Sequence, residues 1–382
     1  MANVLTDLAA DIYKAADTVG RELVGFIPAS TINADGSQEA AKGDTVRSAF
    51  TRAATAGDIA ESMTVPEGTD QTIDNKTLSI TKARSVQIPW TGEDMKHVSN
   101  GMGFETLYGD QIAQAMRTLT NEVETDLATE VYKNASRAVG TAGTTPFASN
   151  FSIIAEARQI IVDNGGVTND GRLSMVMNSS AGTLLRNLAQ LQKANESGND
   201  RLLRQGVLLD LQGAMLRESA QVQSHTKGGG TSYLINNAAT ELAGQTVITL
   251  DGGSGTVLAG DVVTFNGDSN KYVVQTALTG GDIVLSGPGL IQAAADDAAM
   301  TIGNSYAANA MFHQGAVELA MRAPAVPGGS DQAVDAMLVQ DPHSGLVFEI
   351  RVYKGYRKQM IEVAAVWGVK AWKPENIALI LG

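Results

Sequence analysis

Residues 245–285 have the sequence QTVITLDGGSGTVLAGDVVTFNGDSNKYVVQTALTGGDIVL, in which short β-branched runs alternate with Gly, Asn and Asp. The runs predict four brief strands, at 245–250, 261–265, 272–276 and 282–285. Strands of this length, separated by Gly-rich turns, are typical of a small antiparallel barrel or sandwich. We therefore predict a compact β-module over residues 228–303, set in a chain whose flanking parts favour long helices and long strands.

Composition limits the classes of function that the chain can have. It has 382 residues, including 40 glycines, which is enough for two or three domains with a sizeable core. The formal net charge of -13 argues against a nucleic-acid-binding surface, because neutralising phosphates requires clustered Lys and Arg. Acidity therefore excludes binders of nucleic acid but leaves containers of nucleic acid open. The absence of Cys excludes thiol catalysis, Cys-ligated zinc and disulfides.

The start of the chain predicts a helical arm. Apolar residues recur at helical spacing over residues 4–24. Asp7, Asp11 and Asp17 interrupt this segment, so it lacks the basic start and the apolar run of a signal peptide. No apolar stretch approaches the roughly 20 residues that span a bilayer. We expect a soluble chain that is not exported and has no membrane contact, and the arm is either an ordinary surface helix or a contact with another subunit.

Two segments, 45–52 and 77–90, are predicted to be extended. In the second, apolar side chains such as Leu78, Ile88 and Trp90 share one parity and polar side chains share the other, as in a strand with one buried face. At ~3.3 Å per residue, one strand over this segment would reach roughly 45 Å. A hairpin of that length cannot pack along its own core throughout, so we expect it to project and to need a partner.

A long helix is predicted over residues 104–137, where apolar residues recur at spacings of three to five. At 1.5 Å per residue, such a helix of about thirty residues is ~45 Å long, well above the mean helix length. We interpret it as a spine. The acids off its apolar stripe are interpreted as a solvated face: Glu122, Glu124, Asp126 and Glu130.

Shorter elements alternate after the spine helix, which predicts a small α/β layer domain over residues 151–220. Its expected helices and strands lie at 152–163, 172–178, 180–191 and 214–219. The candidates for the N-cap of the second helix are Asn178, Ser179, Ser180 and Thr183. After the β-module, further strands are expected at 312–321, 346–353, 359–370 and 376–381.

The sequence contains no group of residues with the spacing of a known catalytic, phosphate-binding or metal-binding site. The histidines are widely separated, and no two have the i, i+4 spacing of a helical metal site: His97, His225, His313 and His343. Residues 252–256 lack the second Gly of a nucleophile elbow and the Lys of a phosphate loop, so they predict a turn. Asp268, Asp296 and Asp297 belong to no twelve-residue calcium loop ending in Glu. The sequence indicates no catalytic residue, no cofactor-binding residue and no metal ligand.

The charged residues of the projecting hairpin are a candidate subunit interface. Lys82 and Arg84 fall on the parity that is otherwise apolar in the 77–90 segment, and acids gather in the connection before it. One interpretation is that these charges register neighbouring subunits, and the other is that the acids are ordinary solvated loop residues. The candidate interface residues are Arg52, Glu61, Glu67, Asp70, Lys82 and Arg84.

Three stretches, together with the order of the elements, resemble a known family. The most distinctive is the closing run Val366-Trp367-Gly368-Val369-Lys370-Ala371-Trp372-Lys373-Pro374-Glu375-Asn376-Ile377. The others are Phe312 with residues 316–319, and residues 260–267 with residues 272–274. On these residues the chain resembles tailed-bacteriophage major capsid proteins of the Hong Kong 97-type fold. More narrowly, it resembles the Salmonella podovirus coat proteins that carry an inserted domain.

The resemblance implies an α+β fold of six parts. An N-terminal arm would span 1–44, an extended loop hairpin 45–90, a peripheral domain with the spine helix 91–150, and an axial α/β domain 151–222. An inserted antiparallel β-barrel would span 223–306. The last part, 307–382, would return through the axial domain to the strands of the peripheral domain. Gly-rich junctions at 101–103 and 228–230 would act as hinges between slightly different subunit environments.

The implied function is structural and not enzymatic. Hexamers and pentamers of such a subunit build an icosahedral shell that encloses double-stranded DNA without sequence-specific binding, in the virion, after assembly in the host cytoplasm. A portal protein and a separate scaffolding protein are implied, and a decoration protein is left open. From charge alone, the candidate scaffold contacts are Asp7, Asp11, Asp17 and Glu22. No motif identifies a lysine–asparagine cross-link.

Two other classes of function are alternatives. A secreted or surface-layer glycan-binding protein would use the β-module for sugar, with Tyr272 as its central ring, but an export signal is missing. A hydrolase with a β accessory domain lacks a nucleophile–base constellation. The role of the β-module stays open at this point: it would stabilise its own subunit, touch a neighbour, or face solvent.

Overall fold

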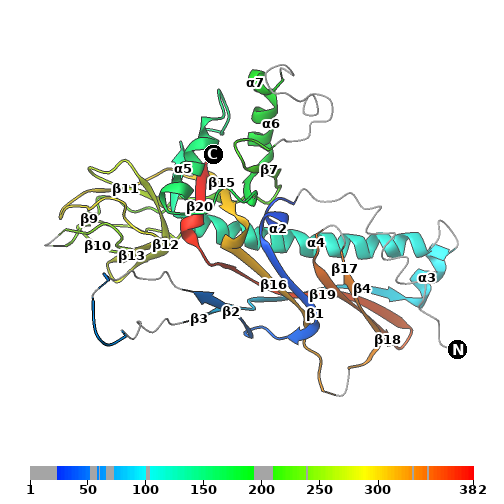
Figure 1. Ribbon diagram of the computed structural model, residues 1–382. Helices are drawn as coiled ribbons and strands as arrows, with labels where there is room; N and C mark the ends of the chain where they lie inside the picture. The colour runs from blue at the N-terminus through cyan, green and yellow to red at the C-terminus, as the bar shows by residue number, and fades with distance from the viewer. Residues whose placement is uncertain are drawn as a thin grey trace.

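The computed structural model describes residues 24–51, 58–59, 61–65, 73–99, 104–192, 210–237, 240–328, 331–341 and 344–382. Its strands form two large sheets and one two-stranded hairpin, and one long helix runs along both sheets (Figure 1). Within the described residues, no helix is long and apolar enough to cross a membrane. Apart from Val24, the expected arm helix at 4–24 lies outside the described residues, as does the expected hinge at 101–103.

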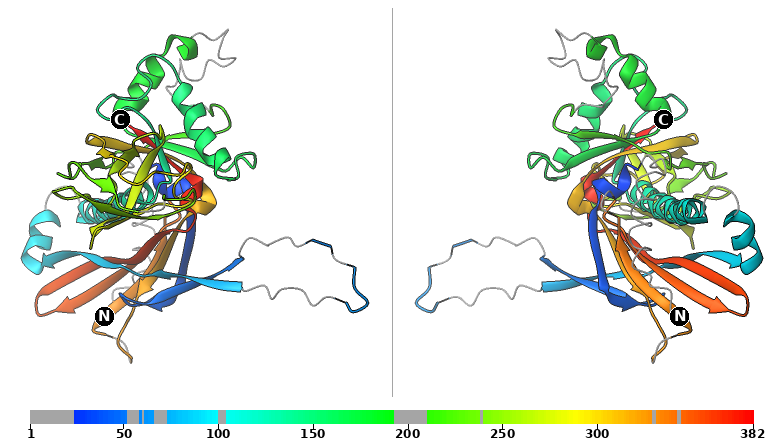
Figure 2. Two further views of the ribbon diagram at one scale, coloured as in Figure 1. Left: turned by 90° about the vertical axis from the view of Figure 1, so that its left-hand side faces the viewer. Right: turned by 90° about the vertical axis from the view of Figure 1, so that its right-hand side faces the viewer.

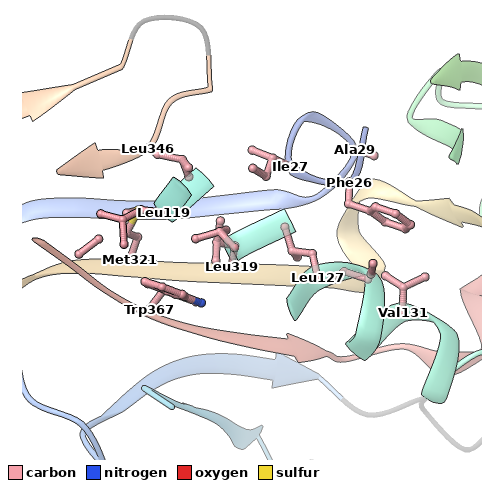
Figure 3. Close-up of a cluster of buried hydrophobic side chains, with 14 of the residues drawn as sticks. Phe26, Ile27, Ala29, Leu119, Leu127, Val131, Leu319, Met321, Leu346 and Trp367 are labelled. Atoms are coloured by element: carbon pink, nitrogen blue, oxygen red, sulfur yellow. The ribbon is translucent and has the colours of Figure 1, made fainter. Parts of the chain in front are cut away.

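The long helix α4 spans Phe104–Lys133 and confirms the spine helix expected from the apolar stripe. Side chains of this stripe, such as Leu119 and Leu127, are no more than 1% exposed. They pack with side chains of the six-stranded sheet, among them Trp367, in one continuous apolar cluster (Figure 3). The helix ends earlier than expected, because Arg137 begins strand β5 (Arg137–Gly140) of the other sheet.

The six-stranded sheet has the order β1-β16-β19-β18-β17, and β4 also pairs with β19. Its strands are β1 (Thr31–Ala40), β4 (Lys82–Thr91), β16 (Val317–Pro324), β17 (Ala333–Gln340), β18 (Val347–Gly355) and β19 (Lys358–Ala371). The short helices α2 (Phe26–Ala29) and α3 (Gly92–Ser99) flank it. Sequence patterns missed β1 and β17. Strand β1 contains Asn33, Asp35 and Gly36, residue types that disfavour strands, and it pairs with β16 over Thr31–Asp35 and again from Glu39 after a break in register. Strand β17 has apolar side chains on its exposed face as well.

The structure corrects the expectation of one strand over residues 77–90. The chain first pairs with β2 (Thr45–Thr51) as β3 (Ile73–Ser79), and then pairs with β19 as β4. The alternation of burial nevertheless continues across the break, and its buried members are Leu78, Ile80, Ile88 and Trp90. The pattern therefore reports the pleat but not the change of partner strand. Figure 2 shows β2 and β3 leading away from the body of the molecule.

The second sheet has twelve strands, five of which follow the order β7-β6-β15-β20-β5. These are β5, β6 (Leu173–Met177), β7 (Met215–Glu218), β15 (Tyr306–His313) and β20 (Ile377–Leu381), and β8 (Ser224–His225) pairs with the start of β15. Three helices accompany them: α5 (Ser152–Asp163), α6 (Ser179–Asn187) and α7 (Ala189–Gln192). The helix expected at 180–191 is divided, because Leu188 has an extended backbone. Asn178 caps α6, with Oδ1 accepting a hydrogen bond from the Ala181 N–H at 2.9 Å.

The β-module confirms the expected short strands. They are β9 (Leu234–Ile235), β10 (Val247–Asp251), β11 (Val262–Phe265), β12 (Lys271–Thr279), β13 (Asp282–Leu285) and β14 (Met300–Ile302). Residues such as Ile248, Val263 and Ile283 form an apolar cluster of its own. However, β12 also pairs with β5, so the module continues the host sheet. A separate closed barrel is therefore not confirmed.

The strand expected at 312–321 is also two strands. The chain leaves the second sheet at the end of β15, makes the short 3₁₀ helix η1 (Gln314–Ala316), and enters the six-stranded sheet as β16. The return strand crosses in the opposite direction, because β19 ends at Ala371 and β20 begins at Ile377 after η2 (Pro374–Asn376). These two crossings join the sheets.

Candidate intersubunit interface

The projecting hairpin is anchored at its root by a small apolar cluster. Leu78 of β3 packs with Ala320 and Val366 of the six-stranded sheet. Gly368 lies where β3 crosses β19, and a Cβ on it would be 2.2 Å from the Ser79 carbonyl oxygen. A side chain at this position would displace the strand above it. The root of the hairpin is thus part of the core.

The described residues of the hairpin tip leave large apolar side chains in solvent. Ile59, Met63 and Val65 are each more than 90% exposed. Asp58 and Glu61, beside them, are also exposed. Burying one such apolar side chain contributes about 1.5–3 kcal/mol. The tip therefore combines a driving force for association with negative charge.

A groove of about 600 Å³ opens at one end of the six-stranded sheet, between the start of α3 and the β18–β19 turn. Trp90 and Met95 contribute to its lining, which is mainly apolar. Its cations are Lys354, Arg357 and Lys358, and Glu93 is the acid among the lining residues. At its rim, Tyr356 is 89% exposed, and the Arg357 guanidinium carbon lies 5.7 Å from the centroid of the Tyr356 ring. In an acidic chain, this groove has the chemistry that complements the hairpin tip.

Lys82 and Arg84 form ion pairs within the chain. Lys82 Nζ lies 2.7 Å from Asp126 Oδ1, and Arg84 Nε lies 3.0 Å from Glu122 Oε2. Both acids belong to α4, so the two cations fasten β4 to the spine helix. Their parity in the strand follows from this contact, because the apolar face of β4 is the face that meets the helix. Their role between subunits stays a prediction.

The interpretation of the α4 acids as a solvated face is wrong. Asp126 Oδ2 accepts a hydrogen bond from Trp367 Nε1 at 2.8 Å, and Glu130 Oε1 accepts one from the Ala371 N–H at 3.1 Å. These acids bind β19 where it passes the helix. One signal was available in the sequence: no Lys or Arg follows Glu122, Glu124 or Asp126 by three or four residues, so these acids have no partner on the helix itself.

Glu124 is fully buried at the junction of three elements. Its Oε1 accepts hydrogen bonds from the Gly25 N–H at 2.6 Å, the Phe26 N–H at 2.7 Å and the Ser219 hydroxyl at 2.7 Å. Its Oε2 accepts one from the Ile27 N–H at 2.9 Å. Burial raises the pKa of Glu124, and these hydrogen bonds oppose the rise. The carboxylate thus ties the segment before β1 to the spine helix and to the end of β7.

The structure places only part of the candidate interface set. Lys82 and Arg84 lie together beside α4, and Glu61 lies exposed in the tip. The other candidates lie outside the described residues: Arg52, Glu67 and Asp70 of the hairpin, and Asp7, Asp11, Asp17 and Glu22 of the arm. The basic groove was missed as a site, although its cations follow each other closely between Lys354 and Lys358.

Titratable groups elsewhere form pairs. His225 Nε2 lies 2.8 Å from Asp261 Oδ1, and His313 Nε2 lies 2.7 Å from Asp170 Oδ2. In the part of the chain that the structure describes, no group of three or more His, Asp or Glu side chains is placed to hold a metal ion. Residues 252–256 connect strands of the module without a helix, as the predicted turn requires.

The β-module offers no aromatic platform for sugar. Its rings are Tyr233, Phe265 and Tyr272, and none is more than 7% exposed. The Tyr272 hydroxyl donates a hydrogen bond to Asp268, and burial together with this contact raises the pKa of Tyr272 to about 12. The glycan-binding alternative is therefore not supported, because its central ring lies inside the module.

Comparison with known proteins identifies the fold. No protein-family model matches the sequence, and no curated protein sequence matches it. A solved chain of Mycobacterium phage Che8 is 15% identical with a TM-score of 0.50, and the match covers 94% of this chain and 90% of that one. A chain in the capsid structure of the cyanophage P-SCSP1u is 10% identical with a TM-score of 0.52, over 95% of this chain and 89% of that one. Over almost its whole length, the chain therefore has the fold of a phage capsid subunit.

Proposed function

We propose that this chain is the major capsid protein of a tailed double-stranded DNA bacteriophage, a structural subunit that self-assembles into an icosahedral shell. The observation that carries the proposal is the fold match over almost the whole chain to a phage capsid. The hairpin supports it independently. A monomeric protein rarely keeps three large apolar side chains fully in solvent on one projecting segment, whereas a subunit buries them against a neighbour.

The tip and the groove are two different surfaces, so contact between them is head-to-tail. Ile59, Met63 and Val65 of one copy would enter the apolar groove beside Trp90 of the next, and Glu61 would meet its cations. Head-to-tail contacts close into rings when the rotation between copies is right. Repeated with slightly different rotations, this contact would give the rings of six and of five that an icosahedral shell requires.

The finer form of the proposal is a Hong Kong 97-type division of the chain. The six-stranded sheet with α4 supports a peripheral domain, and the sheet of β5, β6, β15 and β20 with its helices supports an axial domain. The extended loop would comprise 45–79, since β4 belongs to the six-stranded sheet. The module at 223–306 would be the inserted domain, as in the Salmonella podovirus coat proteins. Segment 1–44 would be the arm, with β1 as its last part.

A shell that encloses a genome implies further partners: the DNA, a portal protein and a scaffolding protein. The chain would enclose double-stranded DNA without binding its sequence, which agrees with the net charge of -13. A portal protein would admit the DNA, and a scaffolding protein would contact the arm at Asp7, Asp11, Asp17 and Glu22. The shell would assemble in the host cytoplasm and remain in the virion.

Lys82 and Arg84 remain part of the proposed interface, where they would contact acids of a neighbouring copy. The Arg84 side chain is 57% exposed although Nε is paired with Glu122, so its outer N–H groups can meet an acid of a neighbouring copy. Each cation would then form an ion pair with α4 in its own subunit and a second contact with a neighbouring subunit. Reversal of both charges should lower the yield of shells more than it lowers the stability of the subunit. Unchanged yield from the double variant would remove these residues from the interface.

The decisive experiment is to purify the chain, expressed alone and with a scaffolding protein, and to examine both by negative-stain electron microscopy and sedimentation. Closed shells of uniform diameter are the expected result. A chain that stays monomeric and compact in both preparations would contradict the proposal. A variant with Ile59, Met63 and Val65 all changed to Ser is the matched control, because it should remain folded and fail to form shells.

A further inference from the structure

The β-module begins and ends at neighbouring points of the host. β8 pairs antiparallel with the start of β15, with His225 opposite Tyr306. Beyond this pair, the Lys227 N–H donates to the hydroxyl of Ser305, the residue before Tyr306, at 3.1 Å. The module is therefore an insertion between two paired strands, β8 and β15. Without the module, a short turn could connect these two strands.

The module is joined to the host by a seam of backbone pairing. β5 pairs in parallel with β20 on one side and antiparallel with β12 on the other, where Ala138 is opposite Lys271. Among the described strands, β12 is the one that covers this second edge of β5. Without the module, β5 would be an edge strand with open N–H and C=O groups. Such edges are templates for pairing with other chains.

Side chains reinforce the seam at both ends of β5. Arg137 Nη1 donates to Asn270 Oδ1 at 2.9 Å, and Gln275 Nε2 donates to Asn134 Oδ1 at 2.7 Å. The Lys271 ammonium donates to the carbonyl of Gly140. These contacts join β12 and the turn before it to both ends of β5 and to the residue that follows α4.

A buried polar node holds the base of the module against the last turn of α4. Asp261 is fully buried and accepts hydrogen bonds from the Gly228 N–H, at 3.0 Å, and from the Leu258 N–H, at 2.7 Å, while His225 lies 2.8 Å away. At Gly260, where φ is +97°, a Cβ would be 2.5 Å from the Tyr132 ring. The expected hinge at 228–230 is instead closely packed, since a Cβ on Gly228 would be 2.2 Å from a backbone oxygen.

We infer that the β-module is an edge cap: it covers the open side of β5, holds the end of the spine helix, and so prevents the host sheet from pairing with other chains. This function does not depend on the proposed function of the chain. Of the three roles that the sequence left open, the seam supports stabilisation of the module's own subunit, because its contacts lie within one chain.

The first test removes the cap. Residues 228–303 are replaced by Asn-Gly, which can form the two-residue turn of a hairpin between Lys227 and Asn304. The deletion variant should shift from a single species to aggregates in light scattering at concentrations where the full chain stays dispersed. A deletion variant that remains dispersed and unfolds at the same temperature as the full chain would overturn the inference.

A second variant keeps the module and weakens only the seam, which protects the test against a deletion that fails to fold. It combines Asn270→Ala, Lys271→Met and Gln275→Ala, and its control combines Asp251→Asn with Thr301→Ala, both at exposed positions outside the seam. Hydrogen exchange should be about tenfold faster in β5 of the seam variant, because local opening becomes easier there. The control should leave exchange in β5 unchanged. Equal exchange of β5 in all three proteins would show that the module does not protect this edge.

Discussion

The hairpin and the β-module are both built from short runs of strand-forming residues, yet they treat their apolar side chains in opposite ways. In the module, Ile248 and Val263 are fully buried in its own cluster. In the hairpin tip, Ile59 and Val65 are at least 92% exposed. The difference separates a segment whose apolar side chains are buried within its own subunit from a segment whose described apolar side chains are exposed, which agrees with the proposed role of the hairpin in the contact between subunits.

The strongest test of this comparison is a matched pair of truncations. Ile248→Ala should reduce the free energy of unfolding by about 2–5 kcal/mol, because it leaves a cavity in the module core. Ile59→Ala should change it by no more than about 0.5 kcal/mol, because that side chain is fully exposed. Urea denaturation of both variants measures the two values. Similar losses in the two variants would mean that the tip is buried within its own subunit.

The root of the hairpin should be less tolerant than its tip. Gly368→Ala forces a Cβ against the Ser79 carbonyl oxygen, and relieving that contact should cost about 1–3 kcal/mol of stability. Gly355→Ala is the control, since the nearest atom to its new Cβ, the Lys358 carbonyl oxygen, would be 3.9 Å away. Thermal unfolding of both variants makes the comparison. A Gly368 variant as stable as the Gly355 variant would show that β3 can shift without loss.

The buried junction at Glu124 should behave like a core and not like a surface acid. Glu124→Gln replaces one acceptor oxygen by an amide that cannot accept, so at least one of the four donors loses its partner. A buried donor without an acceptor costs about 1–3 kcal/mol. Denaturation of the variant measures the loss, with Glu61→Gln in the exposed tip as the control. Equal stability of the two variants would contradict the buried network.

The same carboxyl group predicts a pH dependence. Because burial raises the pKa of Glu124 above its ordinary value of 4.5, the folded state holds this proton more tightly than the unfolded state does. The contribution of this group to stability is therefore greatest below that value and is lost as the pH rises through the pKa of the folded state. The difference in melting temperature between the wild type and Glu124→Gln should shrink as the pH is raised from acid to neutral. A difference that grows over this range would reverse the sign.

The smallest expected effect concerns the charges of the tip and the groove. Glu61→Lys or Lys358→Glu alone should slow assembly, because each places like charges opposite each other. The two together should restore it, because the ion pair forms again with its charges exchanged. The effect is small, since an exposed pair contributes only about 0.2–1 kcal/mol. The effect should weaken at high salt. Light scattering during assembly measures the rates. If the double variant assembles no faster than either single variant, the tip does not meet this groove.

Much of the local structure was predictable. The spine helix, helix α5 and the strands of the module follow from apolar spacing and from Gly-rich turns, since these patterns depend only on near neighbours along the chain. The alternation across β3 and β4 was predictable for the same reason. The hydrogen bonds of the α4 acids were not, because their partners, the segment before β1 and strand β19, are nearly a hundred residues or more away in sequence.

What the sequence determined by itself is which side chains leave water and where the chain must turn. It determined neither that β3 and β4 pair with different strands nor that β15 and β16 belong to different sheets. The tertiary structure also decided that β12 of the module pairs with β5 and that the described apolar side chains of the hairpin tip are exposed. The physical reason is that burial patterns record the pleat and the helical turn, which are local, whereas the choice of partner depends on hydrogen bonds and packing between distant segments.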